Sequence, residues 1–241
     1  MNGIDVSSHN GVINWSEVKA SGVDFAIIRA GYGRLAVQAD QNFIYNYNSA
    51  KLNGIHVGAY WYSYATTPKE AVEEAKACIQ VLGGRMFNYP IYYDVEEKSV
   101  LATGKNNVSN MIRAFCKTLE DHGYYAGVYT SASVAKTHLT EDIAKNYTMW
   151  IAHWGVAKPG FDIWDVWQKS EKGACGGIKG HVDLDFSNKD FPAIMAATGL
   201  NNNPKTEVTP IVTVPEEPAK RTIDVTTTIN GVTYKGTLTE V

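Results

Sequence analysis

The chain of 241 residues lacks features that mark several common classes of protein. No apolar run approaches the roughly 20 residues that a membrane-spanning helix needs, so the sequence predicts no membrane insertion. No basic run stands out and the net charge is −3, which argues against nucleic acid as a partner. The start Met-Asn-Gly-Ile-Asp-Val has neither the charged nor the apolar region of a signal peptide, which predicts synthesis in the cytoplasm without one.

Cysteine is also scarce. Cys78, Cys116 and Cys175 show no paired spacing and no metal-ligand spacing, and no other motif suggests a metal or an organic cofactor. Cys78 and Cys116 fall on apolar helix positions, so we expect buried thiols there. Aromatic residues are plentiful by contrast, with 6 Trp and 14 Tyr. That number suits a protein that binds polysaccharide, although a large β-rich core explains it equally well.

The segment from Tyr92 to Glu97 is the most informative part of the chain. It follows an apolar strand start and ends in carboxylates. Because side chains alternate along a strand, Asp94 and Glu96 share a face, about 7 Å apart along the backbone. Two acids on a buried face are costly to desolvate and shift each other's pKa. The pair therefore indicates a catalytic site, a metal site or ion pairs with buried Arg or Lys.

Strand-like and helix-like segments alternate through the first half of the chain. The expected strands are 3–7, 25–30, 57–62, the segment bearing Asp94 and Glu96, and 125–129. Between them, Thr67-Pro68-Lys69-Glu70 combines an N-cap, a proline at the first helical position and a capping box, and that helix is expected to end at Gly83.

Three further strands then come close together, at 149–154, 165–168 and 182–186, with little room for crossover helices. Five strand–helix units imply parallel strands with helices outside, and three more strands bring the count to eight, enough to close a barrel. The sequence thus predicts an α/β fold, an irregular eight-stranded (β/α)5(β)3 barrel. A doubly wound open sheet is the alternative.

Acids occur at the carboxyl ends of several of these strands. Asp5 is late in the first strand, Asp94 and Glu96 are late in the fourth, and Asp183 and Asp185 are in the last. In such barrels the chemistry lies at this end of the strands, so the acids are expected to converge on one mouth and form a catalytic site.

The residues that carry these features resemble a known family. Asp5-Val6-Ser7-Ser8-His9-Asn10-Gly11, followed by Ile13-Asn14-Trp15, resembles the opening of the glycoside hydrolase family 25 lysozymes, N-acetylmuramidases of bacteria and their phages. Asp94-Val95-Glu96 resembles the paired-acid strand of that family. Gly58-Ala59-Tyr60, Trp150-Ile151-Ala152, Trp167-Gln168 and Val182-Asp183-Leu184 follow in the expected order, so the resemblance runs from about Ile4 to Phe191.

The resemblance implies that Glu96 is the general acid/base and Asp94 its partner carboxylate, with Asp5 and Asp183 completing the catalytic set. Asp185 lies on the same strand face as Asp183, so local sequence does not separate the two, and family position favours Asp183. The family often has His where this chain has Trp61, which leaves the role of that position open.

Glu96 can protonate the leaving oxygen if burial and neighbouring carboxylates raise its pKa. Asp94 then either attacks the anomeric carbon directly or orients the 2-acetamido group of the substrate, whose carbonyl oxygen attacks instead. Both routes retain the anomeric configuration, and an Asp-x-Glu pair on one strand favours substrate assistance.

Candidate substrate-binding residues surround these acids. Tyr60, Tyr62, Tyr129, Trp154 and Trp167 are candidates to line a groove, although each also fits core or rim packing. Arg29 is placed either to bond a substrate oxygen or to neutralise part of the acid cluster, and Gln168 belongs to the Trp-Gln motif.

The chain changes character after residue 200. We expect a catalytic barrel over 1–200, a linker rich in Pro, Thr, Val and Glu over 201–221, and a β-hairpin tail over 222–241. Asn230-Gly231 is a strong hairpin turn signal that sets Ile229 opposite Val232. The resulting pairs place apolar residues on one face, and an isolated hairpin is marginal in water, so the tail is predicted to drive homo-oligomerisation or to dock on its own barrel.

These observations predict an enzyme that hydrolyses the β-1,4 bond between N-acetylmuramic acid and N-acetylglucosamine in peptidoglycan. The expected partner is therefore the glycan strands of the bacterial wall. The expected setting is bacteriolysis of the endolysin type, in which the protein is made in the host cytoplasm and reaches the wall after release. A barrel that binds wall glycan without cutting it is the alternative.

Overall fold

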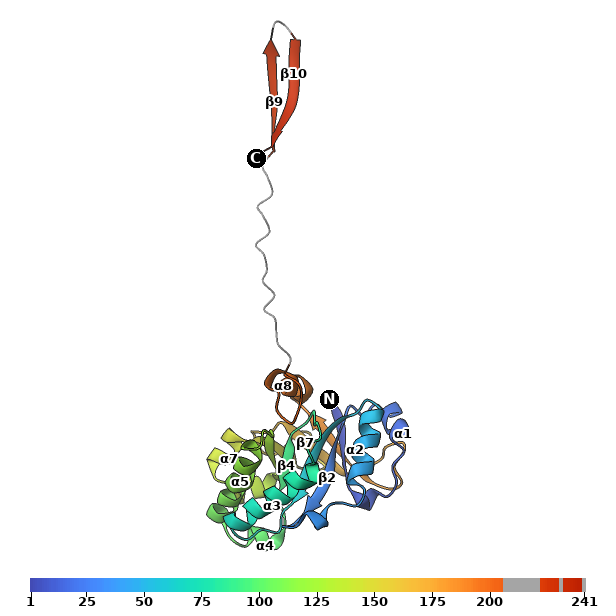
Figure 1. The fold of residues 1–241 in the computed structure, drawn as a ribbon, viewed down its shortest axis with the longest axis vertical. Helices are drawn as coiled ribbons and strands as arrows, with labels where there is room; N and C mark the ends of the chain where they lie inside the picture. The colour runs from blue at the N-terminus through green and yellow to red at the C-terminus, as the bar shows by residue number, and fades with distance from the viewer. Residues whose placement is uncertain (206–221, 230–231, 240–241) are drawn as a thin grey trace. The chain divides into compact units, whose positions relative to one another are not determined.

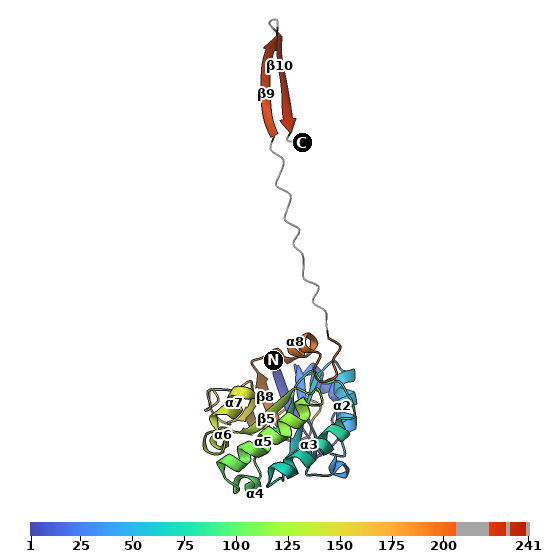
Figure 2. The same ribbon diagram turned by 60° about the vertical axis from the view of Figure 1, so that its left-hand side comes forward.

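The computed structural model describes residues 1–205, 222–229 and 232–239. Eight strands of the first part close into a barrel in sequence order, with helices around the outside (Figure 1, Figure 2). The strands are β1 Asn2–Val6, β2 Phe25–Tyr32, β3 His56–Tyr62, β4 Ile91–Asp94, β5 Ala126–Ser131, β6 Thr148–Ala152, β7 Val166–Gly173 and β8 Val182–Ser187.

Pairing between these strands confirms the predicted eight-stranded α/β barrel. Strands β1 to β7 run parallel, and β8 is antiparallel to both β7 and β1. Because β8 pairs with β1, the sheet has no open edge, and the alternative of a doubly wound open sheet is wrong. Five strand–helix units come first, and β6, β7 and β8 then follow one another with no helix between them in this described part of the chain, as the spacing of the sequence predicts.

The outer layer holds seven helices that lie between the strands in sequence, and an eighth follows β8. They are α1 Trp15–Ala20, α2 Phe43–Leu52, α3 Pro68–Leu82, α4 Lys98–Leu101, α5 Lys105–Glu120, α6 Ala132–His138, α7 Glu141–Asn146 and α8 Phe191–Thr198, with short 3-10 turns at Ser8–Asn10 and Ala36–Gln38. Helix α3 shows why the boundaries fall where they do. Thr67 accepts a hydrogen bond from the Glu70 amide, and Gly83 ends the helix in the left-handed conformation.

Apolar residues pack in two layers. A large cluster fills the space between strands and helices, and it contains the buried thiols Cys78 and Cys116, as predicted. A smaller cluster of mostly aromatic residues fills the barrel interior toward the amino ends of the strands. Glycines make room for it, since a Cβ at Gly127 would lie 2.6 Å from the Tyr92 ring. Apolar side chains therefore fill the interior near the amino ends of the strands, and polar side chains occupy the interior at the carboxyl ends.

A segment of three asparagines, residues 201–203, closes the amino end of the barrel. The Asn201 side chain is fully buried, accepts a hydrogen bond from the Tyr125 amide at 2.7 Å and donates to the Tyr89 carbonyl at 2.8 Å. The Asn203 side chain donates to the Phe87 carbonyl at 2.7 Å. Residues just past position 200 are thus built into the barrel, and the compact unit that contains it extends over Met1–Glu207.

The second compact unit, Val208–Val241, contains a two-stranded antiparallel sheet of β9 Thr222–Ile229 and β10 Val232–Thr239. Its register pairs Ile229 with Val232 and Ile223 with Leu238, which confirms the predicted register. The side chains of the predicted apolar face, and residues 206–221, lie outside the described residues. In the part of the chain that is described, no helix is long and apolar enough to cross a membrane.

Candidate active site

Polar side chains fill the barrel interior at the carboxyl ends of the parallel strands. Asp5 on β1, Asp94 at the end of β4, Gln168 on β7 and Asp185 on β8 are each at most 6% exposed. Glu96 and Asp183 lie nearer to solvent. The structure therefore brings the acids of three separate strands to one mouth. Such a concentration of buried carboxyl groups is costly without a role in binding or chemistry.

The segment after β4 carries the paired acids. It is held rigidly, because the Val95 amide bonds the Tyr129 carbonyl at 3.0 Å and the Thr130 hydroxyl donates to the Val95 carbonyl at 2.7 Å. The Oδ1 atom of Asp94 is buried and has no hydrogen-bond partner among the described residues. Burial, and secondarily Glu96, raises the pKa of Asp94 well above its usual range, with Arg29 opposing the shift.

Glu96 has the environment of a general acid. Its side chain reaches solvent at the mouth, yet the surrounding protein still desolvates it. Desolvation raises the pKa of Glu96, and the negative charges of Asp183 and Glu97 raise it further. The Glu96 carboxyl group therefore keeps its proton to a higher pH than an isolated glutamate does.

Asp5, Asp183 and Asp185 form the other side of the mouth. Asp5 lies opposite Asp183 in the β1–β8 register, and Gln168 lies opposite Asp185 in the β7–β8 register. The Gln168 amide donates to Asp5 at 2.7 Å, and the Trp150 indole donates to Asp185 at 2.8 Å. Burial raises the pKa of Asp183 to about 6 and that of Asp185 to about 8.

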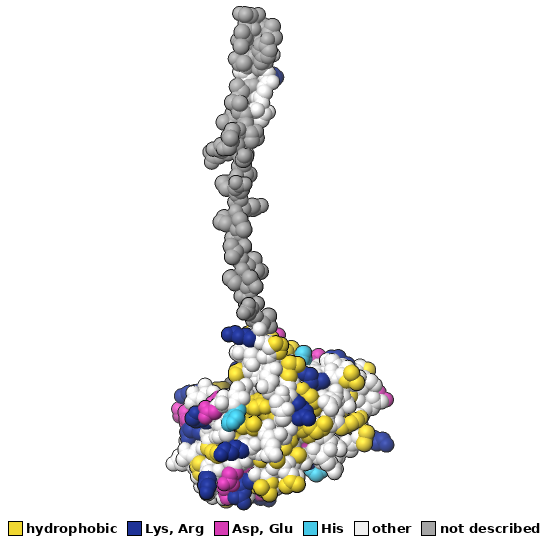
Figure 3. Space-filling view, in the orientation of Figure 1, with side chains coloured by type: hydrophobic (Ala, Val, Ile, Leu, Met, Phe, Trp, Pro, Cys, Tyr) yellow, Lys and Arg dark blue, Asp and Glu magenta, His cyan; other side chains and the backbone are white. Residues whose placement is uncertain are grey.

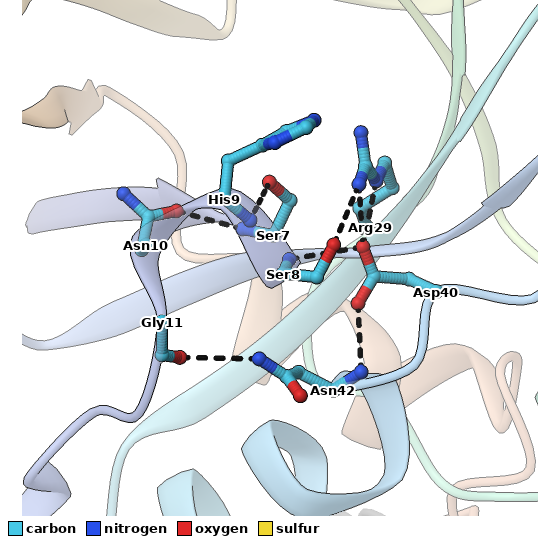
Figure 4. A network of polar contacts seen from close by, with 8 residues as sticks. All are labelled: Ser7, Ser8, His9, Asn10, Gly11, Arg29, Asp40 and Asn42. Atoms are coloured by element: carbon cyan, nitrogen blue, oxygen red, sulfur yellow. Dashed lines mark hydrogen bonds and ion pairs between the residues drawn. The ribbon is translucent and has the colours of Figure 1, made fainter.

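Arg29 belongs to a network beside the acids (Figure 4). Its guanidinium donates to Asp40 at 2.8 Å and to the Ser8 hydroxyl at 3.0 Å. The same Asp40 carboxylate accepts from the backbone amides of Ser8 and Asn42. Asp40 thus ties the loop after β1 to the loop after β2, and the position of Arg29 is fixed before any substrate binds.

Two hollows lie at the carboxyl ends of strands on either side of β4, and the five candidate catalytic acids are not among the residues that line them. One, of about 590 Å³, adjoins the Arg29 network at the ends of β1, β2 and β3, and is lined by Ser8, His9, Arg29, Tyr32, Ala39, Asp40, Gln41, Tyr62 and Tyr64. The other, of about 450 Å³, lies at the ends of β5 and β6 and is lined by Ser131, Ala132, Ser133, Lys136, Ala152, His153 and Trp154. Because the acids of β4 lie between these two sets of strands, the hollows suit a long ligand that crosses the mouth.

The predicted substrate-binding residues occupy different places. Tyr60 and Tyr129 point into the interior beside the acids, and both pack against Trp150. The Tyr62 hydroxyl donates to Glu97 at 3.1 Å, and its ring lines the larger hollow. Trp154 is 44% exposed and lines the smaller hollow.

Two predicted residues are placed away from a groove. Because Gln168 faces the barrel interior, its neighbour Trp167 faces the outside, where it packs against Trp164. Gln168 itself is 3% exposed, and Tyr129, Trp154 and Asp5 occupy most of its hydrogen-bonding capacity. Trp61 is also buried, and its indole donates to the Gly33 carbonyl at 2.8 Å.

Sequence reasoning missed three residues of the mouth. Asp40 and Tyr64 lie in loops, outside any periodic pattern, so no local signal pointed to them. The smaller hollow includes Lys136 on α6, which also carried no motif. Among the described residues, no group of three or more His, Cys, Asp and Glu is arranged to hold a metal ion. On the face that Figure 3 shows, basic and acidic side chains of the barrel are interspersed.

Comparison with known proteins places these features in a wider group. The sequence profile described as glycosyl hydrolases family 25 matches residues 4–178. The autolytic lysozyme of Clostridium acetobutylicum is 32% identical over 186 residues, 77% of this chain and 55% of that protein, so the chain spans about half of that relative's length. The crystal structure of a bacterial lysozyme from Streptomyces coelicolor superposes with a TM-score of 0.72 at 30% identity, covering 85% of this chain and 98% of that one.

A third similarity includes a bound ligand. The modular autolysin LytC from Streptococcus pneumoniae, solved in complex with a synthetic peptidoglycan ligand, superposes with a TM-score of 0.68 at 28% identity. The match covers 76% of this chain and 46% of LytC.

Proposed function

The chain belongs to family 25 of the glycosyl hydrolases, and we propose that its barrel cleaves the β-1,4 bond between N-acetylmuramic acid and N-acetylglucosamine in peptidoglycan. One observation supports this most directly. Glu96 sits at the mouth with a raised pKa, beside a buried Asp94 whose Oδ1 atom has no partner among the described residues. A proton donor and an unused acceptor, two residues apart, are what cleavage of such a bond requires.

The first step assigned to this geometry is protonation. Glu96 donates its proton to the glycosidic oxygen as the bond to the anomeric carbon breaks. Burial, Asp183 and Glu97 raise the pKa of Glu96, which favours the protonated form that this step needs. General acid catalysis of this kind accelerates a reaction by about 100- to 10,000-fold.

The second step concerns the developing positive charge. The carbonyl oxygen of the 2-acetamido group attacks the anomeric carbon and forms a bond there as the leaving group departs. The acetamido N–H donates to Oδ1 of Asp94, which supplies the missing partner of that buried atom and favours the ionised form of a carboxyl group whose pKa burial raises. Water then opens the ring intermediate and returns a proton to Glu96, so the configuration is retained.

The two hollows supply room for the glycan strand. Tyr62 and Tyr64 pack against each other with ring centroids 5.2 Å apart and form one wall of the larger hollow. Trp154 is exposed at the smaller hollow, and its indole donates to Gln168 at 3.0 Å, which fixes the orientation of the ring. Rigid aromatic faces on both sides of the acids suit sugar rings that span the mouth.

The competing function is a barrel that binds wall glycan without cutting it. The fold and the aromatic walls fit both functions, so the distinction depends on turnover. We expect purified bacterial cell walls incubated with the protein to release new reducing ends of muramic acid. Ends of N-acetylglucosamine would contradict the bond assignment, and retained binding without any new ends would favour the binding barrel.

Two variants sharpen this test. Glu96→Gln removes the transferable proton at nearly constant shape and is expected to lower kcat by about 100- to 10,000-fold, with wall binding retained. Glu141→Gln on α7 is the matched control, because that side chain is 88% exposed and its one ion pair among the described residues is with Lys145. Its activity should equal that of the unmodified protein, and near-normal activity in Glu96→Gln would eliminate Glu96 as the acid.

A further inference from the structure

Asp185 has an unexplained atom. The residue is 1% exposed, and its Oδ1 atom accepts a hydrogen bond from the Trp150 indole at 2.8 Å. Its Oδ2 atom is also buried and meets no N–H or O–H donor among the described residues when every carboxyl group is taken as ionised. A buried acceptor without a donor costs about 1–3 kcal/mol, so some group is expected to supply a proton there.

The neighbour that can supply it is Asp5. Strand β1 pairs with β8 so that Gly3 lies opposite Asp185 and Asp5 opposite Asp183, which places the side chains of Asp5 and Asp185 diagonally on one inner face. This placement brings the carboxyl group of Asp5 close to those of Asp183 and Asp185, the three groups shift one another's pKa, and a hydrogen bond between Asp5 and the buried Asp185 becomes available. Two carboxyl groups form such a bond only when one of them carries a proton.

Gln168 determines what else Asp5 can do. Its Oε1 atom accepts from the Tyr129 hydroxyl and the Trp154 indole, each at 3.0 Å. The oxygen is thus identified by two donors, and only the Nε2 end can face Oδ2 of Asp5, 2.7 Å away. This amide donates to Asp5 and cannot accept from it, so a proton on the other oxygen of Asp5 is directed toward its carboxylate neighbours.

We propose that Asp5 and Asp185 share one proton and act as a single monoanion, which makes Asp185 a positioning residue for Asp5. The inference rests on the proposed function only for its catalytic meaning, since the shared proton exists whether or not the barrel cuts glycan. It also separates the two acids of β8. Asp183 also interacts with Asp5, but it is half-buried and open to hydration, whereas Asp185 is sealed from water and its Oδ2 atom has no other donor among the described residues.

The charged groups around the pair support a shared proton. Asp183 on β8 raises the pKa of both members, and Glu171 on β7 raises the pKa of Asp183 in turn. Lys169 on β7 opposes the shift at Asp185 without forming an ion pair with it among the described residues. The Arg29 guanidinium of β2 is occupied by Asp40 and Ser8. Tyr60 and Tyr129, from β3 and β5, are neutral phenols whose own pKa values are raised further by these acids.

The proton has a consequence for stability. Unfolded carboxyl groups lose their protons at a pH of about 4, whereas burial raises the pKa of Asp185 to about 8. Between these values the native state binds more protons than the unfolded state, so the contribution of the pair to the free energy of unfolding falls as pH rises. Once the shared proton is lost at higher pH, the pair becomes two buried negative charges, which repel each other.

Infrared spectroscopy of the full chain tests the proposal directly, because a protonated carboxyl group has a carbonyl stretch that a carboxylate lacks. Asp5→Asn and Asp185→Asn each replace the shared proton by an amide donor at nearly constant shape. At neutral pH each variant is expected to lose the same single carbonyl band, and the double variant to lose no more. Asp142→Asn, an exposed acid paired with Arg113, should keep the band.

The possible outcomes are distinct. Two different bands lost from the two single variants, or no band lost from either, would overturn the shared proton. If Asp5→Asn fails to fold, Asp185→Asn and the pH dependence of unfolding still decide. The free energy of unfolding of Asp185→Asn should fall less between pH 4 and 8 than that of the unmodified protein, and an equal fall would contradict the proposal.

Activity provides a separate readout. The alkaline limb of kcat/KM should move to higher pH in Asp185→Asn, because an amide donor does not dissociate. A protein that shows the shared band but cuts no glycan would refute the proposed function and leave the shared proton intact.

Discussion

Each acid of the mouth has its own combination of exposure and partners. Glu96 is accessible and desolvated, Asp94 is buried with an unpartnered oxygen, and Asp185 is sealed against Trp150. These environments raise the pKa of all three, and among the three only Glu96 has access to solvent, a property that it shares with the half-buried Asp183 on β8. The division of roles between proton donor and charge stabiliser therefore follows from where each strand ends.

Asp94→Asn tests the role of the second carboxyl group. The amide cannot bear the negative charge that stabilises the attacking acetamido group, so kcat should fall by about 100-fold or more, with KM little changed. Proton NMR spectroscopy of the first product that the unmodified protein releases should show retained anomeric configuration. A covalent sugar adduct trapped on Asp94 or Asp183 would remove the substrate-assisted route, and an inverted product would remove both retaining routes.

The positions of the main acids followed from strand alternation and from the rule that barrels carry chemistry at the carboxyl ends of their strands. The same alternation predicts that Trp167 lies outside the barrel and not in a groove, because adjacent strand residues face opposite sides and Gln168 faces inward. Asp40 could not have been found in this way. It sits in an irregular loop, and its link to Arg29 depends on how the loop after β2 meets the loop after β1.

At the scale of elements, the barrel was predictable because strand and helix signals alternate with a regular period. Helix α3 carried complete start and stop signals in its own sequence. The three-asparagine segment carried none, because asparagine is equally common in free loops. Its partners are backbone groups of Tyr89, Tyr125 and Phe87, and only the folded barrel brings these together.

Asn201→Ala tests how much this segment contributes to the barrel. The change removes one buried and one part-buried side-chain hydrogen bond and leaves the Tyr89 carbonyl and the Tyr125 amide without those partners, which should lower the free energy of unfolding by about 2–4 kcal/mol. Asn202→Ala is the matched control, because both residues have a positive φ, of 56° and 59°, and only Asn201 is sealed from water.

Urea denaturation of both variants measures the difference. Asn202→Ala carries the same backbone strain but loses an exposed hydrogen bond to the Arg85 carbonyl and a long, part-buried one to the Tyr124 hydroxyl, so it should cost clearly less. Equal losses in the two variants would show that the backbone conformation, and not the buried side chain, holds the segment in place.

At the scale of the whole molecule, the chain consists of a barrel unit and a separate hairpin unit. The hairpin has two strands and 8 residues in each, which is marginal for independent stability in water. Both of its strands are edges, and unpaired edges favour pairing with another chain. We propose that a second copy of the hairpin is the partner, since identical units at equal concentration can close symmetrically.

Truncation after Lys205 tests this proposal and keeps the asparagine segment that is part of the barrel. The full chain should form oligomers in light scattering, whereas the truncated chain should be monomeric with an unchanged kcat on short soluble glycans. On intact walls the truncated chain should act more weakly at low enzyme concentration, because linked copies gain avidity from several weak contacts. Thr226→Pro in β9 is a second probe, because proline has no backbone N–H to donate to a neighbouring strand. Monomers in every case would refute self-association, and a truncated barrel that lost turnover on soluble glycans would instead show that the tail contributes to the barrel of its own chain.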